Sequence, residues 1–290
     1  MDTWPPTCSL EALAARDELL RLVRNFFHER GILEVQTAAL AGATVTDPTV
    51  ESIEVPGYGW LQTSPEYQLK RLLAAGAPSL YQLGPVFRAG EAGRHHNPEF
   101  VMLEWYRLGV TDRELMAEVT ELVDAALGPA PVRTFTYASV QAHAPAGLTV
   151  SGLTEREAAD LKLAVGLANL GPGRFFIVDY PAEQAVLARL RPENPALAAR
   201  FELVVDGVEL ANGYWELGDA AALESRFVHD LAERDRRGQM LPPLDRHFLS
   251  AMAAGLPPCS GVALGFDRLL MLRLGAKSLR EVVAFPIDRA

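Results

Sequence analysis

The sequence of 290 residues is poor in cysteine: Cys8 and Cys259 lie far apart and lack the spacing of metal ligands. A disulfide scaffold and a zinc ribbon are therefore disfavoured. No run approaches the roughly 18 apolar residues that span a bilayer. Residues 1–6 also lack the basic and apolar segments of a secretory signal. We expect a protein of the reducing cytoplasm with no membrane partner.

Positive charge is also scarce. The chain has 27 Lys and Arg residues against 37 Asp and Glu, which gives a formal net charge of −10. A protein that binds a long stretch of nucleic acid normally presents a broad basic surface, so this class of function is disfavoured, although local basic patches remain compatible. With 49% hydrophobic residues and a mean hydropathy of +0.06, the chain has the composition of a folded globular protein.

Several familiar catalytic signatures are missing. The sequence has no Gly-x-x-x-x-Gly-Lys-Ser/Thr phosphate loop and no Gly-x-Gly-x-x-Gly after a strand. The Gly-x-Ser-x-Gly and His-Glu-x-x-His motifs are absent too. A nucleotide enzyme with this sequence must therefore hold phosphates without a P-loop.

The chain instead alternates amphipathic helices with short strands. Helical spacing and capping residues predict helices over residues 9–30, 64–76, 111–127, 219–237, 246–253 and 266–274. Short or alternating apolar runs predict strands over residues 32–35, 50–63 (a pair), 79–83, 85–88, 100–108, 175–179 and 260–264, and a hairpin over 201–212. This order favours an α+β fold with an antiparallel core. Dense Pro, Gly and Ala over about 128–173 predict a variable insertion with one helix, within a single domain of residues 1–290.

The densest polar stretch, residues 87–100, lies between two predicted strands. Its guanidinium groups, Arg88 and Arg94, suit phosphate or carboxylate oxygens. The period of two in the following strand places one row of side chains on one face: Phe100, Met102, Glu104 and Tyr106. That row offers a ring for a base and an anionic end for an ammonium group. A solvated loop beside an amphipathic strand explains this stretch alone equally well, and a metal site at His95-His96 is disfavoured because adjacent side chains point apart.

A second constellation surrounds the predicted turn Asp206-Gly207. A two-residue loop pairs Val204 with Glu209, and Glu202 with Ala211. Glu202 and Glu209 then share a face as diagonal neighbours, about 7–8 Å apart. Two such carboxylates repel each other unless a cation lies between them, which favours Mg²⁺ held together with substrate phosphates. The alternative is a pair of exposed acids on a hairpin at the edge of the sheet.

Further polar side chains alternate along the second strand of this hairpin, at Asn212, Tyr214 and Glu216. A regular strand would turn them away from Glu209. We therefore expect a β-bulge near Ala211 or Gly213 if all of them serve one pocket.

A third constellation runs from Gly261 to Arg268. Its small residues allow a ligand to approach the backbone, and the helix predicted from Phe266 presents free N–H groups to an anion. Arg268 in the first turn of that helix opposes the helix dipole, so its position is easier to explain if it meets a phosphate.

Taken in order, these three pieces resemble motifs 1, 2 and 3 of class II aminoacyl-tRNA synthetases of the lysyl branch, from about residue 10 to the end of the chain. The resemblance is most specific in four stretches: Thr63 to Tyr67, Arg94 to Glu104, Glu209 to Gly213, and Gly261 to Arg268. Few residues precede motif 1, where lysyl-tRNA synthetases have an anticodon-binding barrel. The chain is therefore similar to the stand-alone members of that branch, the elongation factor P–lysine ligases, which have no anticodon-binding domain.

The resemblance implies a six-stranded antiparallel sheet flanked by helices, and a homodimer built through motif 1. It assigns amino-acid binding to Ser64, Glu66, Glu104, Tyr106, Asn212, Glu216 and Ala263. It assigns ATP binding to Arg88, Glu91, His96, Asn97, Phe100, Glu209, Leu210, Gly265 and Arg268, with catalytic roles for Arg88 and Arg268. The Mg²⁺ carboxylates it implies are Glu202 and Glu209.

Some residues depart from the family pattern. Ala38 stands where motif 1 normally ends in Pro, and Ala89-Gly90-Glu91 replaces the usual Asn-Glu after the motif 2 arginine. Tyr214 occupies a position that is usually Phe in the lysyl enzymes. Ala263 replaces the Gly of lysyl-tRNA synthetases, and the extra methyl can discriminate between substrates by about 1–3 kcal/mol. This favours β-lysine, as the (R) isomer, over α-lysine.

The implied function is a two-step ligase that forms an acyl-adenylate of lysine or β-lysine with ATP and passes it to a lysine of elongation factor P. One alternative is a tRNA-directed aminoacylating or tRNA-modifying ligase, which the net charge of −10 disfavours. The other is a non-catalytic paralogue that senses an amino acid, although such a protein needs none of the predicted ATP-binding residues.

Overall fold

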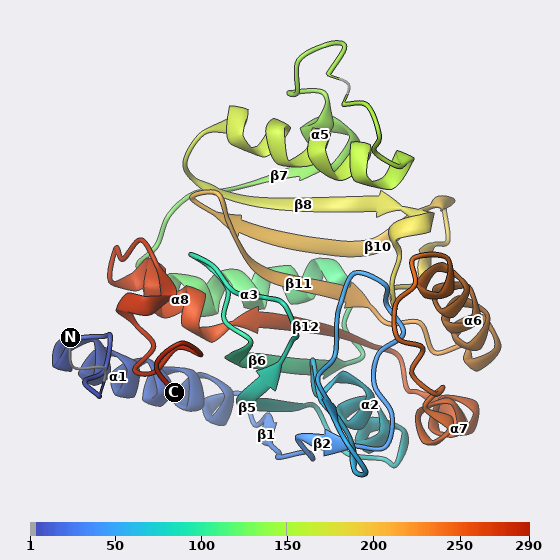
Figure 1. Ribbon diagram of the computed structural model, residues 1–290, viewed down its shortest axis with the longest axis horizontal. Coiled ribbons are helices and arrows are strands. Elements are labelled where there is room, and N and C mark those ends of the chain that lie inside the picture. The colour runs from blue at the N-terminus through green and yellow to red at the C-terminus, as the bar shows by residue number, and fades with distance from the viewer. Residues whose placement is uncertain (1–3, 149) are drawn as a thin grey trace.

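The computed structural model describes residues 4–148 and 150–290. Its centre is a nine-stranded sheet, with helices packed against it and around its ends (Figure 1). The two ends of the described chain lie on the same side of the molecule, beside the N-terminal helix. Among the described residues, no helix is both long and apolar enough to cross a membrane.

The order of strands in the large sheet is β1-β5-β6-β12-β11-β10-β8-β7, with β9 paired to β10. Six neighbouring strands, from β5 to β8 in this order, are antiparallel, whereas β1 and β7 add to the two edges in parallel. The strands are β1 (Leu33–Glu34), β5 (Leu80–Phe87), β6 (Glu99–Leu108), β7 (Val132–Thr136), β8 (Arg174–Pro181), β9 (Leu190–Arg191), β10 (Asn194–Val205), β11 (Val208–Trp215) and β12 (Cys259–Gly265). A small separate sheet holds β2 (Leu40–Ala41), β4 (Gly59–Leu61) and β3 (Glu54–Val55). The predicted α+β class with six antiparallel strands is confirmed, and the sheet extends beyond them.

Eight α-helices lie within the described residues: α1 (Leu10–Glu29), α2 (Glu66–Ala74), α3 (Asp112–Leu127), α4 (Tyr137–Gln141), α5 (Glu155–Leu170), α6 (Ala220–Arg236), α7 (Arg246–Gly255) and α8 (Phe266–Arg273). The main core joins α1, α3 and α8 to one face of the sheet. Phe27 of α1 stacks on Tyr81 of β5 and meets the edge of Trp105 of β6. This packing leaves the opposite face of the central strands free for polar side chains.

Most predicted elements are present, because their end signals are local. The capping box at Thr111 and Glu114 opens α3 as predicted. Three predictions were wrong in detail. Residues 80–87 form one continuous strand despite Pro85. The N-cap of α2 is Pro65 rather than Ser64, although the Ser64 hydroxyl accepts a hydrogen bond from the N–H of Glu66.

The third error concerns the insertion at about 128–173, for which one helix was predicted. It contains β7 and two helices, α4 and α5. Strand β7 pairs in parallel with β8, so this segment extends the large sheet at its edge. Strand β7 has five residues, three of them exposed, so it shows little of the apolar alternation from which a strand can be predicted.

A buried arginine fastens the loop before β3 to α6. Arg234 is fully buried and donates hydrogen bonds to the carbonyl oxygens of Met240, Asp47 and Val50, at 2.8, 2.8 and 3.2 Å. It also donates to the Glu51 carboxylate at 2.9 Å. Removing this side chain leaves several acceptors without a donor.

We expect Arg234→Met to lower the free energy of unfolding by about 2–3 kcal/mol, the scale of a lost charged hydrogen-bond donor in the interior. Urea unfolding monitored by circular dichroism measures this change. Arg236→Met, at an exposed position on the same helix, is the control and should change stability by less than about 0.5 kcal/mol. Equal stability of the two variants would contradict the anchoring role.

Candidate active site

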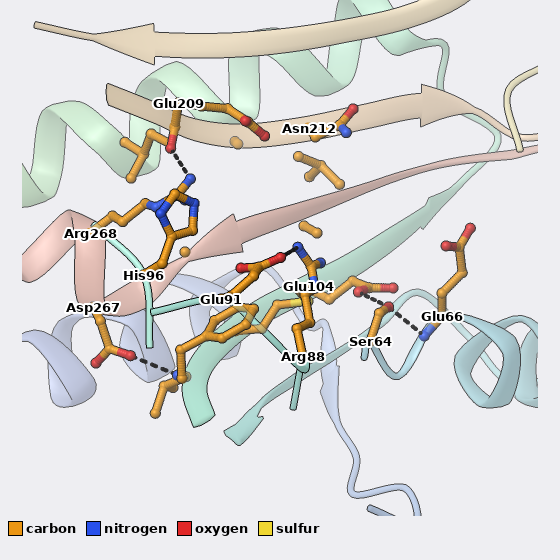
Figure 2. A pocket seen from close by; sticks show the side chains of 18 of the residues that line it. Ser64, Glu66, Arg88, Glu91, His96, Glu104, Glu209, Asn212, Asp267 and Arg268 are labelled. Carbon is orange, nitrogen blue, oxygen red and sulfur yellow. Dashed lines mark hydrogen bonds and ion pairs between the residues drawn. The ribbon is translucent and has the colours of Figure 1, made fainter. Parts of the chain in front are cut away.

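A cavity that is partly open to solvent lies between the central strands and the loop that follows β5 (Figure 2). It is lined by Ser64, Glu66, Arg88, Glu91, His96, Asn97, Phe100, Glu104, Tyr106, Glu209, Leu210, Asn212, Glu216, Ala263, Gly265 and Arg268. These are all the predicted site residues except Glu202, which does not line the cavity.

Strand β6 supplies the floor of the cavity through its alternation. Phe100, Met102, Glu104 and Tyr106 line the cavity, as the period of two predicts, whereas Leu103 and Trp105 pack into the core behind it. Glu104 is only 2% exposed. The alternative interpretation of this segment, a solvated loop beside an ordinary amphipathic strand, is therefore wrong for the strand.

The cavity has a basic end and an acidic end. In Figure 2, Arg268 and His96 lie at one end, Ser64, Glu66 and Glu104 lie at the other, and Arg88 lies between them. This division matches a ligand with a polyanionic group at one end and ammonium groups at the other.

At the basic end, Arg268 is held by three acceptors. It donates to the carbonyl oxygens of Glu209 at 2.7 Å and His95 at 3.2 Å, and its Nη2 lies 2.8 Å from Nε2 of His96. Burial and the positive charge of Arg268 lower the pKa of His96, so the ring stays neutral at neutral pH and can accept this hydrogen bond. These contacts fix the guanidinium group in the mouth of the cavity before any ligand arrives.

A neighbouring contact positions the start of α8. Asp267 is buried, accepts a hydrogen bond from the N–H of Val101 at 2.7 Å, and forms an ion pair with Arg16 of α1. Because Asp267 adjoins Arg268, this contact fixes the first turn that carries the arginine. Neither Asp267 nor Arg16 is among the site residues predicted from the sequence.

Arg88 is held less tightly. Its Nε donates to the carbonyl oxygen of Thr63 at 3.3 Å, and its guanidinium carbon lies 5.2 Å from the centre of the Phe100 ring. The nearest carboxylate oxygen, from Glu91, is 3.5 Å away. The terminal nitrogens of Arg88 thus face the cavity with one weak partner, a suitable state for a group that will bind phosphate.

At the acidic end, Glu104 is enclosed by hydroxyl groups. Ser64 donates to one of its oxygens at 2.6 Å and Tyr106 donates to the other at 2.8 Å. Burial, and then repulsion from the Glu66 carboxylate, raise the pKa of Glu104 to about 8. In the free protein at neutral pH, this carboxyl group therefore largely holds a proton, which an incoming ammonium group would displace.

Glu216 lies deeper in the same end and meets a residue that the sequence analysis missed. Its Oε2 lies 2.5 Å from the ammonium group of Lys70, which is fully buried in α2 and also contacts Glu66 at 2.6 Å. The other oxygen, Oε1, accepts no hydrogen bond among the described residues. Burial raises the pKa of Glu216 to about 7, although Lys70 opposes the shift. A buried acceptor without a donor suits a ligand ammonium group.

The predicted bulge in the β10–β11 hairpin exists. Val204 pairs with Glu209 as predicted, but the register shifts between Leu203 and Val204, so Glu202 pairs with Asn212 instead of Ala211. The extra residue places Glu209 and Asn212 on the cavity side. Both strands lie inside the sheet, so the alternative of an exposed edge hairpin is wrong.

The proposed cation carboxylates differ in their surroundings. Glu202 forms an ion pair with Arg200 at 2.5 Å, and Arg200 also donates to Asn212 at 3.3 Å. Glu209 is open to the cavity, yet the surrounding protein and the charge of Glu202 raise its pKa. Arg200 is a further residue that the sequence analysis missed.

This donor set fits Mg²⁺ only together with a phosphate ligand. No group of three or more His, Cys, Asp and Glu side chains that could hold a metal occurs within residues 4–148 and 150–290. Mg²⁺ commonly takes one or two carboxylates and completes its shell with substrate phosphates and water. Glu209 lines the cavity beside Arg268, and the charge of Glu202, which does not line the cavity, acts on it. One carboxylate is therefore open to a cation beside the basic end.

Two of the residues that depart from the family pattern, Ala38 and Ala263, make contacts that the structure shows. The N–H of Ala38 donates to the Gln68 side chain at 2.8 Å, a hydrogen bond that proline cannot make. Ala263 pairs with Glu104 on one side and Asn212 on the other, so its methyl group lies between two predicted amino-acid ligands.

Gly261 is needed for the acidic end to form. A Cβ at this position would lie 2.3 Å from Cε1 of Tyr106 and 2.6 Å from Oε1 of Glu216. We expect Gly261→Ala to weaken amino-acid binding by about 10–100-fold, since overpacking typically costs about 1–3 kcal/mol. Nucleotide binding at the other end should change less than about threefold. Calorimetric titration of each ligand measures both effects, and equal losses for the two ligands would contradict the steric explanation.

The sequence matches the family of class II tRNA synthetases (D, K and N) over residues 7–289. It is 41% identical to a protein of Vibrio cholerae serotype O1 named elongation factor P–(R)-β-lysine ligase, over 99% of this chain and 98% of that protein. Proteins with the same name from Salmonella gallinarum and Salmonella dublin are each 42% identical over the same shares of both chains.

Proposed function

The chain belongs to the class II tRNA synthetases of the D, K and N group, and from this membership we propose that it is an ATP-dependent ligase that activates (R)-β-lysine and attaches it to a lysine side chain of elongation factor P. One observation carries the proposal: a single cavity is lined by Arg88 and Arg268 and, at the end away from Arg268, by an acidic group made of Glu66, Glu104 and Glu216.

In the first step, an oxygen of the substrate carboxylate attacks the α-phosphorus of ATP. A bond forms between that carboxylate oxygen and the α-phosphorus. The bond from the α-phosphorus to the oxygen that bridges it to the β-phosphorus breaks, and pyrophosphate leaves. Arg88 binds the α-phosphate and Arg268 the γ-phosphate, while Phe100 stacks on the adenine. The protein acts through position and charge, since the proposal requires no covalent protein nucleophile.

The acidic end holds the substrate while this happens. Glu66, Glu104 and Glu216 bind the two ammonium groups, with Ser64, Tyr106 and Asn212 as hydrogen-bonding partners. Glu209 and Glu202 would hold Mg²⁺, which offsets the charge of the phosphates when bound. In the second step, the neutral ε-amine of a lysine of elongation factor P attacks the activated carbonyl, loses a proton and displaces AMP.

We further propose a single catalytic domain that works in the cytoplasm as a homodimer. Exposed leucines at the motif 1 end, Leu33 in β1 and Leu40 in β2, support a self-association surface there. Size-exclusion chromatography with light scattering tests this part separately from catalysis.

Mass spectrometry of elongation factor P tests the main proposal. Elongation factor P incubated with this protein, ATP and (R)-β-lysine should gain one β-lysyl group, whereas α-lysine should react more slowly. A parallel reaction with labelled amino acid and tRNA tests the alternative ligase. Label on tRNA and none on elongation factor P would reject the proposed acceptor. The absence of ATP–pyrophosphate exchange with either isomer would reject the activation step.

A further inference from the structure

Lys70 lies behind the wall of the cavity rather than in it. Its side chain is fully buried, and its ammonium group lies 2.6 Å from Oε1 of Glu66 and 2.5 Å from Oε2 of Glu216. Both glutamates line the cavity, whereas Lys70 does not. The lysine thus connects two acids from distant parts of the chain, one on its own helix α2 and one just after β11.

The other polar groups around Lys70 do not replace these partners. Its ammonium nitrogen lies 5.9 Å from the centre of the Tyr106 ring on β6. Glu104 and Cys259 are close enough to interact with its charge. Arg189 also approaches Glu216 but donates its hydrogen bond to the backbone oxygen, at 3.0 Å. Lys70 is therefore the cation that meets the Glu216 carboxylate directly.

Lys70 keeps its charge despite its burial. Removal from water lowers the pKa of a lysine, but the carboxylates of Glu216 and Glu66 outweigh this effect and raise the pKa of Lys70. The fully ionised acidic end then holds three carboxylates, Glu66, Glu104 and Glu216, and one ammonium group. Three negative charges and one positive charge give a local charge of −2.

We propose that Lys70 is a positioning residue that sets the charge of the substrate pocket to −2, which selects an amino acid with two ammonium groups, and that orients Glu216 to receive one of them. The inference rests on the proposed function and gives a physical reason for its substrate, because a diamino monocarboxylic acid such as (R)-β-lysine matches this charge. A monoamino acid leaves one of the three carboxyl groups without a cation, so that group must either keep its proton or be buried as an unpaired charge, which is costly in the interior.

Without Lys70, the three carboxylates repel one another more strongly, and each holds its proton to a higher pH. A charge in contact with two carboxylates shifts their titration by at least about one pH unit. The dicationic substrate must displace those protons in order to bind. The pH dependence of substrate affinity therefore reports on Lys70, whereas a loss of packing alone would weaken binding equally at all pH values.

The experiment measures the dissociation constant of (R)-β-lysine by calorimetry between pH 6 and 9, without ATP. For Lys70→Met, we expect the pH at which affinity reaches its plateau to rise by about one unit or more. Affinity should then fall about tenfold or more at pH 7 and return to within about threefold of the wild-type value at pH 9. Lys70→Arg, which retains the charge, should keep the wild-type pH profile. Lys162→Met removes the same charge from an exposed position on α5 and should bind like the wild type.

The inference is overturned if Lys70→Met loses affinity equally at every pH. It is also overturned if the pH profile of affinity for Lys70→Arg matches that of Lys70→Met. If Lys70→Met does not fold at pH 8 but folds at pH 5, where the carboxyl groups take up protons, the charge explanation is supported. Failure to fold at both pH values shows that Lys70 serves the fold and overturns it. If the wild type binds neither (R)-β-lysine nor α-lysine, the proposed function fails, an outcome that differs from all of these.

Discussion

Arg88→Met is expected to lower the rate of ATP–pyrophosphate exchange by about 10³-fold. Loss of a single well-placed hydrogen-bond donor to a developing charge costs about 10²–10³-fold in rate, and Arg88 offers a full charge with two terminal nitrogens. Those nitrogens have one weak protein partner, Glu91 at 3.5 Å. Arg88 therefore gives up little interaction energy with the protein when it binds phosphate. The effect should appear mainly in kcat, because the contact strengthens as charge develops on the phosphate oxygens.

Two further variants serve as controls for this experiment. Arg88→Lys retains the charge but not the two parallel donors, and we expect it to recover less than about a tenth of the lost rate. Arg133→Met makes the same substitution at an exposed position on β7 and should leave exchange unchanged. Full exchange by Arg88→Met would remove Arg88 from the mechanism, while Arg268 could still bind nucleotide.

The elements that the sequence predicted well are those with local signals. The capping box at Thr111 and the Asp206-Gly207 turn depend on a few adjacent residues, and both lie where predicted. The cavity side of β6 followed from its period of two. The need for a bulge in β11 followed from the same rule, because Glu209 and Asn212 cannot share a face of a regular strand.

The parts that were missed depend on partners that are distant in sequence. Glu66 and Lys70, four residues apart on α2, look like an ordinary surface pair, and only the fold brings Glu216 to the same ammonium group. A contact between side chains from distant segments is a tertiary property, so spacing rules cannot supply it. Arg200 is a different case: it lies two residues before Glu202 on β10, so the period of two places both side chains on one face and would have predicted their ion pair.

Glu104→Gln is expected to weaken (R)-β-lysine binding at pH 8.5 by about 10²-fold, because an interior ammonium group loses a hydrogen-bonded carboxylate partner. In the wild type, the pKa of Glu104 is raised to about 8 and that of Glu216 to about 7, so affinity should increase by about tenfold between pH 7 and 8, more steeply below pH 7, and level off above pH 8. In the variant, the remaining pH dependence should come from Glu216, whose pKa is raised to about 7. Calorimetric titration across this range measures both changes.

The raised pKa of Glu104 also predicts how the stability of the free protein depends on pH. Its folded-state pKa lies above the ordinary value of 4.5, so its protonated form stabilises the fold at low pH, and that contribution is lost as the pH rises through about 8. Glu104→Gln cannot lose a proton and should melt at least about 5 °C above the wild type at pH 9, the effect of about 2 kcal/mol in a protein of this size. The two proteins should melt within about 2 °C of each other at pH 5, and Glu99→Gln, at an exposed position on the same strand, should follow the wild type throughout. If Glu104→Gln binds the substrate more weakly but melts at a higher temperature at alkaline pH, the charge of Glu104 serves substrate binding and lowers the stability of the folded protein. A variant that is less stable at both pH values would show that the carboxylate serves packing instead.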